Sequence, residues 1–151
     1  MDPSKKDKRY NRLYDQIVNL LKDKEYPVAR MATVTAVLHH KMDYYFWTGF
    51  YMLVDGELIV GPYQGPVACI SLEKNIGVCW AGINQEKTIV VPDVHAFPGH
   101  IACDSRSRSE IVVPKKNKHG DVIGVLDVDS KDLGSFDLVD AKWLEKIVGL
   151  I

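Results

Sequence analysis

The sequence predicts an α+β fold in which an antiparallel sheet carries helices from both ends of the chain on one face. Amphipathic segments open and close the chain, whereas the middle shows short strand patterns joined by tight turns. Strands joined by tight turns pair antiparallel, because a parallel pair needs a long crossover connection. The chain of 151 residues is long enough to bury a hydrophobic core, and we expect one domain over residues 1–151.

Apolar residues at helical spacing predict the helices of the two ends. The first helix is expected over about Lys6 to Lys24, and Pro27 ends it and begins a second. The closing helix is expected over Asp137 to Ile151. The residues expected to form the apolar faces of these helices are Tyr10, Leu13, Tyr14, Ile17, Leu20 and Leu21, then Val28, Met31, Val34 and Leu38, and finally Leu138, Trp143, Leu144, Ile147 and Val148.

Runs of aromatic and β-branched residues bounded by turn signals predict the strands. Asp55-Gly56 is a strong hairpin signal, and His119-Gly120-Asp121 marks a second turn. A short helix is expected over Gly77 to Asn84, and Pro92 to Ser109 is expected to be a long loop, which in a compact domain favours a functional role. The expected strands are Tyr44 to Val54, Glu57 to Val60, Val67 to Leu72, Thr88 to Val91, Glu110 to Lys115 and Val122 to Asp129.

Charge and hydropathy argue against several classes of partner. The net charge of -1 shows no electrostatic footprint for nucleic acid or an anionic membrane. The apolar runs are too short to span a bilayer. The amino-terminal segment, Met1 to Lys8, is polar with no apolar core behind it, so we expect no secretory signal and predict a cytoplasmic protein. The sequence leaves the oligomeric state open, a homodimer included.

Three cysteines, Cys69, Cys79 and Cys103, fall within a stretch of 35 residues. Clustered cysteines in a chain without secretory features favour thiol redox chemistry or metal binding. Cys103 is the strongest candidate for a nucleophile, because the long loop offers access and either turn amides or His100 could lower its pKa. The alternative is a free thiol that only packs, and the residues alone leave both interpretations open.

A zinc site is another interpretation of the same segment. Its ligands would come from Cys69, Cys79, Cys103, His95 and His100. The spacings lack the paired Cys-x-x-Cys pattern of structural zinc sites, so we expect no metal. No phosphate-binding loop, dinucleotide-binding turn or Gly-x-Ser-x-Gly motif occurs, and we expect no cofactor.

Three acids and two aromatic residues form the second group of candidates. Asp127 and Asp129 are two apart on one predicted strand and therefore share a face, and Glu110 begins the strand that pairs with it. Such a negative pocket suits an ammonium group, a metal, or proton transfer by a carboxyl group with a raised pKa. The alternative is a strand end that emerges into solvent. Trp47 and Tyr51 also share a face, where they could line a small-ligand site, although the pattern alone favours a role in the core.

Several motifs, taken together and in this order, resemble those of the GAF-domain free methionine-(R)-sulfoxide reductases. The resemblance runs from about Trp47 to Asp129, and the motif around Cys103 is its most specific part. The motifs are Trp47-x-Gly49-Phe50-Tyr51, Gly61-Pro62-Tyr63-Gln64-Gly65, Ala68-Cys69, Gly77-Val78-Cys79, the segment Asp93-Val94-His95-x-Phe97-Pro98-Gly99-His100-Ile101-Ala102-Cys103-Asp104, Ser109-Glu110-Ile111-Val112-Val113-Pro114 and Gly124-Val125-Leu126-Asp127-Val128-Asp129.

The resemblance implies a GAF-like antiparallel sheet of about six strands and the reduction of free methionine-(R)-sulfoxide, with thioredoxin as the electron donor. The competing interpretation is a GAF module that only binds a small ligand or regulates a partner. By resemblance, Cys103 matches the catalytic cysteine, Cys69 the resolving cysteine, Cys79 an auxiliary third cysteine, Glu110, Asp127 and Asp129 the acids of the substrate pocket, and Trp47 and Tyr51 its aromatic wall.

Overall fold

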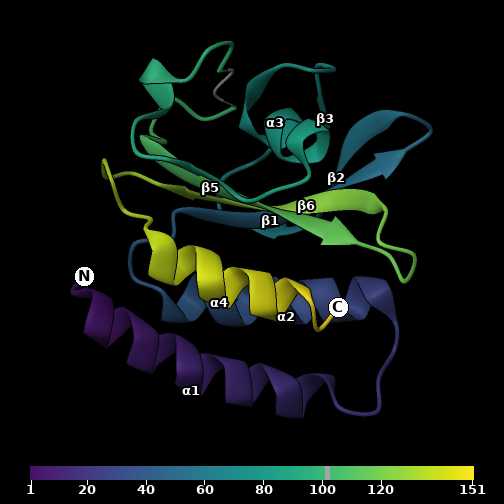
Figure 1. Cartoon of the computed structure of the whole chain (residues 1–151), viewed down its shortest axis with the longest axis vertical. Coiled ribbons are helices and arrows are strands. Elements are labelled where there is room, and N and C mark those ends of the chain that lie inside the picture. The colour runs from purple at the N-terminus through teal and green to yellow at the C-terminus, as the bar shows by residue number, and fades with distance from the viewer. Residues whose placement is uncertain (101–102) are drawn as a thin grey trace.

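An antiparallel sheet of six strands, in the order β3-β2-β1-β6-β5-β4, forms the centre of the computed structural model, which describes residues 1–100 and 103–151 (Figure 1). This arrangement confirms the predicted α+β class. In chain order the elements are α1 (Pro3–Leu21), α2 (Pro27–Lys41), β1 (Trp47–Val54), β2 (Glu57–Gln64), β3 (Ser71–Leu72), α3 (Gly77–Gln85), β4 (Ile89–Val91), the 3₁₀ helix η1 (Val94–Ala96), β5 (Ser109–Lys116), β6 (Val122–Ser130) and α4 (Leu138–Val148).

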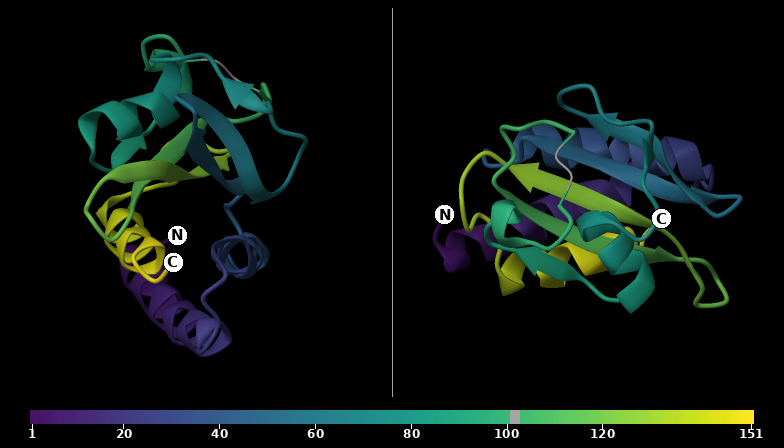
Figure 2. Two further views of the ribbon diagram at one scale, coloured as in Figure 1. Left: turned by 90° about the vertical axis from the view of Figure 1, so that its right-hand side faces the viewer. Right: turned by 90° about the horizontal axis from the view of Figure 1, so that it is seen from above.

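The helices lie in layers on the two faces of the sheet. Helices α2 and α4 pack on one face, and α1 covers both of them as an outer layer (Figures 1 and 2). Helix α3 lies on the opposite face, against β5 and β6. The terminal helices therefore share one face, as expected, and α2 joins them. None of the described helices combines the length and hydropathy needed to cross a bilayer.

Alternation along the strands gives each face of the sheet its own core. On the side of α2 and α4, Phe50, Leu126 and Val128 are fully buried. On the side of α3, Trp47 and Val125 belong to a second apolar cluster. Because successive side chains of a strand point to opposite faces, the odd-numbered positions of β1 and β6 face α3.

The first helix begins and ends earlier than expected. Its start is fixed by Pro3 at the first helical position and by the Asp2 carboxylate, which accepts a hydrogen bond from the amide of Lys5 at 3.2 Å. Three residues expected to face the core are exposed. The buried face of α1 runs through Ile17 and Leu21 and leaves one of them outside it, and the other two lie in the first turns of α2 and α4. The three are Leu20, Val28 and Leu138.

Strand β2 is longer than expected and continues through Gly61-Pro62 to Gln64. Its pairing with β1 shifts register between Gly49 and Tyr51, so two residues of β2 oppose Phe50. Such a bulge tolerates a proline, which has no amide hydrogen for the ladder. Strand β3 is shorter than expected and spans only Ser71–Leu72, and residues 67–70 form a loop instead.

A buried ion pair joins the two ends of the chain. The Asp140 carboxylate of α4 is fully buried and accepts hydrogen bonds from Lys6 Nζ at 2.6 Å, Tyr10 Oη at 2.6 Å and Tyr44 Oη at 2.5 Å. The backbone amide of Asp137 donates a fourth bond at 2.8 Å. Tyr44 was expected in a strand, and instead it lies in the turn before β1, where its hydroxyl reaches this carboxylate.

We expect Lys6→Met to lower the free energy of unfolding by about 3–5 kcal/mol, because it leaves the Asp140 charge buried without its cation. Asp43→Asn is the matched control, since it breaks the exposed pair with Arg9, whose atoms lie 3.1 Å apart, and should cost less than about 1 kcal/mol. Urea unfolding measures both, and equal losses would contradict a structural role for the buried pair.

Candidate functional site

A cavity of about 260 Å³ lies on the α3 face of the sheet, beneath the loops that precede α3 and β5. The residues singled out from the sequence come from six parts of the chain, and the fold brings them together there. The cavity is lined by Trp47, Tyr51, Cys69, Cys79, Cys103, Glu110, Asp127 and Asp129, among others.

Three acids form one wall of the cavity because β5 and β6 pair in a register that sets Glu110 opposite Asp129. Asp127 lies two residues before Asp129, on the same face. Glu110 and Asp127 are buried, at 5% and 6% exposure. The alternative of a strand end in solvent is therefore wrong for these two acids, and Asp129 is partly buried.

Burial raises the pKa of each of these acids. The pKa of Glu110 lies well above its usual range, because desolvation is reinforced by the charges of Asp127 and Asp129. Desolvation also raises the pKa of Asp127, although contacts with Glu110 and Cys79 oppose the shift. For Asp129, desolvation and the charge of Asp127 raise the pKa, and the hydroxyl of Ser107 opposes them. A carboxyl group with a raised pKa can serve as a general acid.

Stacked aromatic rings lie beside the acids on the same face of the sheet, because Trp47 pairs with Asp129 across β1 and β6. The Trp47 ring lies 5.7 Å from that of Tyr51 and 5.3 Å from that of Tyr63, with interplanar angles of 23° and 20°. Gly49 makes this stack possible, because a Cβ at that position would lie 2.4 Å from the Tyr63 Cβ and 2.6 Å from the Trp47 ring. Trp47 and Tyr51 are thus core residues and cavity-lining residues at once.

The aromatic wall also holds the loop that carries the first cysteine. Trp47 Nε1 donates a hydrogen bond to the carbonyl of Pro66 at 3.1 Å. Tyr51 Oη donates to the carbonyl of Cys69 at 3.1 Å. Both bonds tie residues 66–69 to β1, so the position of Cys69 depends on the side chains that line the cavity.

The cysteines divide into a joined pair and a separate thiol. Cys69 and Cys103 form a disulfide with their Cα atoms 5.7 Å apart. Cys103 is exposed and Cys69 is half-buried, so a reductant can reach the bond from solvent. Cys79 lies in the first turn of α3 as a buried free thiol. Burial, together with the charges of the neighbouring acids, raises the pKa of Cys79, which disfavours its thiolate.

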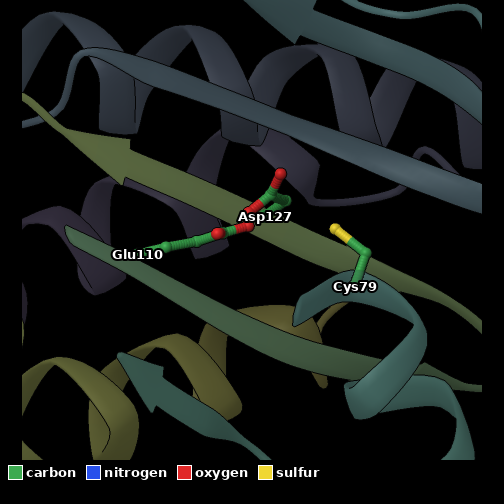
Figure 3. A group of neighbouring side chains, drawn as sticks. All are labelled: Cys79, Glu110 and Asp127. Carbon is green, nitrogen blue, oxygen red and sulfur yellow. The ribbon is translucent and has the colours of Figure 1, made fainter. Parts of the chain in front are cut away.

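The zinc ligands considered from the sequence do not converge in the described part of the chain. The disulfide takes two of the cysteines, and His95 Nδ1 lies 3.3 Å from the Asp93 carboxylate instead. His100 lines the cavity, but burial lowers its pKa, so its imidazole is neutral near pH 7 and adds no positive charge that would favour a Cys103 thiolate. The group with metal-ligand geometry is instead Cys79, Glu110 and Asp127, shown in Figure 3.

Other residues in and around the site were given no role from the sequence. Tyr63 joins the aromatic stack from β2, and Ser107 and Asp104 line the cavity from the loop before β5. The position of Tyr63 was foreseeable only with the bulge, because a strand ending at Val60 would have excluded it. Asp104 ends the motif around Cys103 but was assigned no role there, and nothing in the local pattern distinguishes Ser107 from an ordinary loop residue.

This fold and cavity define a GAF domain, and residues 27–151 match the family model of that domain. The GAF domain-containing protein A of Dictyostelium discoideum is 48% identical over 147 residues, which are 97% of this chain and 92% of that protein.

The more specific matches are enzymes. The free methionine-R-sulfoxide reductase of Escherichia coli strain K12 is 40% identical over 121 residues, which are 80% of this chain and 73% of that protein. The X-ray structure of the free methionine-R-sulfoxide reductase of Neisseria meningitidis, in complex with its substrate, superposes with a TM-score of 0.89 at 42% identity and covers 93% of this chain and 84% of that chain. This chain belongs to the GAF-domain free methionine-(R)-sulfoxide reductase family.

The buried acids predict an unusual dependence of stability on pH. They hold protons to higher pH in the folded chain than in the unfolded chain, where Asp and Glu titrate near pH 4. The folded state then binds more protons, so the free energy of unfolding falls as pH rises from about 4 through the raised folded pKa values. Each unit of pKa difference contributes about 1.4 kcal/mol per group.

The free energy of unfolding of Asp127→Asn should therefore increase relative to that of the wild type as pH rises. Urea unfolding between about pH 4 and pH 8 measures this difference. Asp43→Asn, at an exposed position, is the control and should show no such trend. A difference between Asp127→Asn and wild type that stays constant across this range would contradict the raised pKa.

Proposed function

We propose that the chain reduces free methionine-(R)-sulfoxide to methionine, acting as a single GAF domain over residues 1–151, with thioredoxin as the reductant and the cytoplasm as its location. The observation that carries the proposal is the Cys69–Cys103 disulfide at the mouth of a cavity lined by buried acids. A disulfide in that position is the product expected after one reduction of a sulfoxide. The family relationship supports the same activity.

The reaction begins with the reduced pair of cysteines. The Cys103 thiolate attacks the sulfoxide sulfur and forms an S–S bond, while a proton passes to the sulfoxide oxygen. The protonated oxygen then moves to the Cys103 sulfur as the S–O bond of the substrate and the new S–S bond both break. Methionine leaves, and Cys103 becomes a sulfenic acid. The Cys69 thiol then condenses with it, forming the disulfide and releasing water. Thioredoxin, a dithiol, returns both cysteines to thiols by thiol–disulfide exchange.

The acids and the aromatic wall supply selectivity in this proposal. The substrate's ammonium group meets Glu110, Asp127 and Asp129, and its methyl and methylene groups pack against Trp47 and Tyr51. A methionine inside a polypeptide has no ammonium group to offer, so the negative wall would be left uncompensated. Glu110, whose pKa is raised by burial and by the charges of Asp127 and Asp129, is the acid we assign to hold the proton that the oxygen needs.

Cys103→Ser should abolish methionine release even in a single turnover without reductant, because no other residue in the proposal supplies the sulfur nucleophile. Methionine release from reduced protein, measured by chromatography after mixing with the R sulfoxide, tests this. Full release by the variant would refute the assignment of Cys103.

Cys69→Ser should release about one methionine per chain but turn over poorly with thioredoxin, because attack on the sulfoxide and disulfide formation are separate steps. The measurement is NADPH consumption with thioredoxin and thioredoxin reductase, beside the single-turnover yield. An unchanged steady-state rate would show that Cys79 or the donor itself resolves the sulfenic acid.

Asp129→Asn should lower kcat/KM at least about tenfold without unfolding the domain, because removing a charge-assisted contact in a desolvated site costs on the order of 2 kcal/mol. Glu73→Gln is the matched control, since Glu73 lines the cavity at an exposed position. N-acetyl-methionine sulfoxide should be a poor substrate for wild type and should be affected much less by Asp129→Asn. Equal reduction of free and acetylated sulfoxide by wild type would refute ammonium recognition.

A further inference from the structure

Cys79, Glu110 and Asp127 bring three ligand atoms together from three different elements of the fold. The thiol comes from α3, and the carboxyl groups come from β5 and β6. The ligand atoms all lie within 4.8 Å of one another. In Figure 3 the two carboxyl groups point toward each other, and the sulfur points toward Asp127 from the helix. All three residues are buried.

One oxygen of this group lacks a partner. Asp127 Oδ1 is buried and has no hydrogen-bond partner among the described residues, and its residue is 6% exposed. A buried carboxylate oxygen without a donor is costly, and its usual remedy is a cation or a hydrogen bond. No lysine or arginine is found among the described residues that line the cavity. A bound cation would supply the partner that Asp127 Oδ1 lacks.

We propose that Cys79, Glu110 and Asp127 form a binding site for a thiophilic divalent cation, Zn²⁺, in the substrate-free protein. One thiolate and two carboxylates suit Zn²⁺ rather than Mg²⁺ or Ca²⁺, which prefer oxygen ligands alone. Ligand atoms around tetrahedral zinc lie about 3.3–3.7 Å apart, so shifts on the order of 1 Å would complete the site. Three protein ligands leave the fourth position for a water molecule from the cavity.

Zn²⁺ binding leaves the three ligands and the ion with a net charge of -1. The Cys79 thiol gives up its proton to solvent as the Zn–S bond forms, and both carboxylates bind ionised, so three negative charges surround a charge of +2. No electron transfer occurs, and the disulfide remains intact.

A consequence for the enzyme follows, and this part alone depends on the proposed function. Asp127 and Glu110 are the acids proposed to meet the substrate's ammonium group. Zn²⁺ and methionine sulfoxide would therefore exclude each other, and Zn²⁺ would act as a competitive inhibitor.

The disulfide form of the whole protein provides a direct test, because Cys79 is then the one free thiol. Isothermal titration with ZnCl₂ should show one Zn²⁺ per chain, and MgCl₂ should show no binding. Titration with CdCl₂ should give an ultraviolet charge-transfer band that reports a thiolate–metal bond. Neither readout requires enzymatic activity, so failure here is distinguishable from failure of the proposed reductase.

Two substitutions locate the site. Cys79→Ser should eliminate the cadmium band, and Asp127→Asn should weaken Zn²⁺ binding by at least about 100-fold, since even the outer partners of metal ligands are worth 10–100-fold. Glu73→Gln, at the exposed rim, should bind Zn²⁺ like wild type. Absence of binding to the disulfide form, a cadmium band that persists in Cys79→Ser, or unchanged affinity in Asp127→Asn would each overturn the proposal.

Discussion

The alternation of side chains along β1, β5 and β6 is the constraint on which both halves of the molecule depend. These strands are adjacent in the sheet, and every even-numbered position of β1 and β6 faces the helices α2 and α4, while the odd positions face α3. A slip of one residue in the pairing of β6 would turn Asp127 into the helical core and Val128 into the cavity. The register that forms the core therefore also forms the site.

Because one register forms both faces, the apolar core on the side of α2 and α4 offsets the free-energy cost of burying the acids on the side of α3. The acids on the α3 face are desolvated and repel one another, which opposes folding near neutral pH. On the other face, Phe50 and Leu126 are fully buried, and the Lys6–Asp140 ion pair joins the outer helix α1 to α4. Residues outside the site thus offset the free-energy cost of desolvating the acids before a ligand binds.

The features that the sequence predicted correctly were those set by residues close together in the chain. The shared face of Asp127 and Asp129 follows from their spacing of two, and the hairpin at Asp55-Gly56 follows from turn chemistry. The extension of β2 past Pro62 was missed, because a bulge depends on the partner strand and not on local propensity. Likewise, the apolar spacing placed Leu138 inward, but this residue is exposed at the start of α4. Spacing does not show which turns of a helix have other elements packed against them.

The long-range contacts were not foreseeable from the residues themselves. The Cys69–Cys103 bond closes a separation of 34 residues, and its prediction rested on family resemblance rather than on spacing. The Lys6–Asp140 pair spans nearly the whole chain, and a lysine in an amphipathic helix is ordinarily a solvent-facing residue. Both depend on how distant elements pack, which a single sequence does not encode in any local pattern.

The tight contact at Gly49 has a consequence for attempts to redesign what the cavity accepts. A methyl group at that position would collide with both Trp47 and Tyr63, so the aromatic wall and the glycine behind it behave as one unit. Trp47 in turn is hydrogen-bonded to the loop that leads to Cys69. Enlarging the cavity by trimming a single ring would also loosen the loop that carries Cys69. Substitutions at 47, 49 and 63 are therefore expected to depend on one another, since a change at one position alters the packing of the other two.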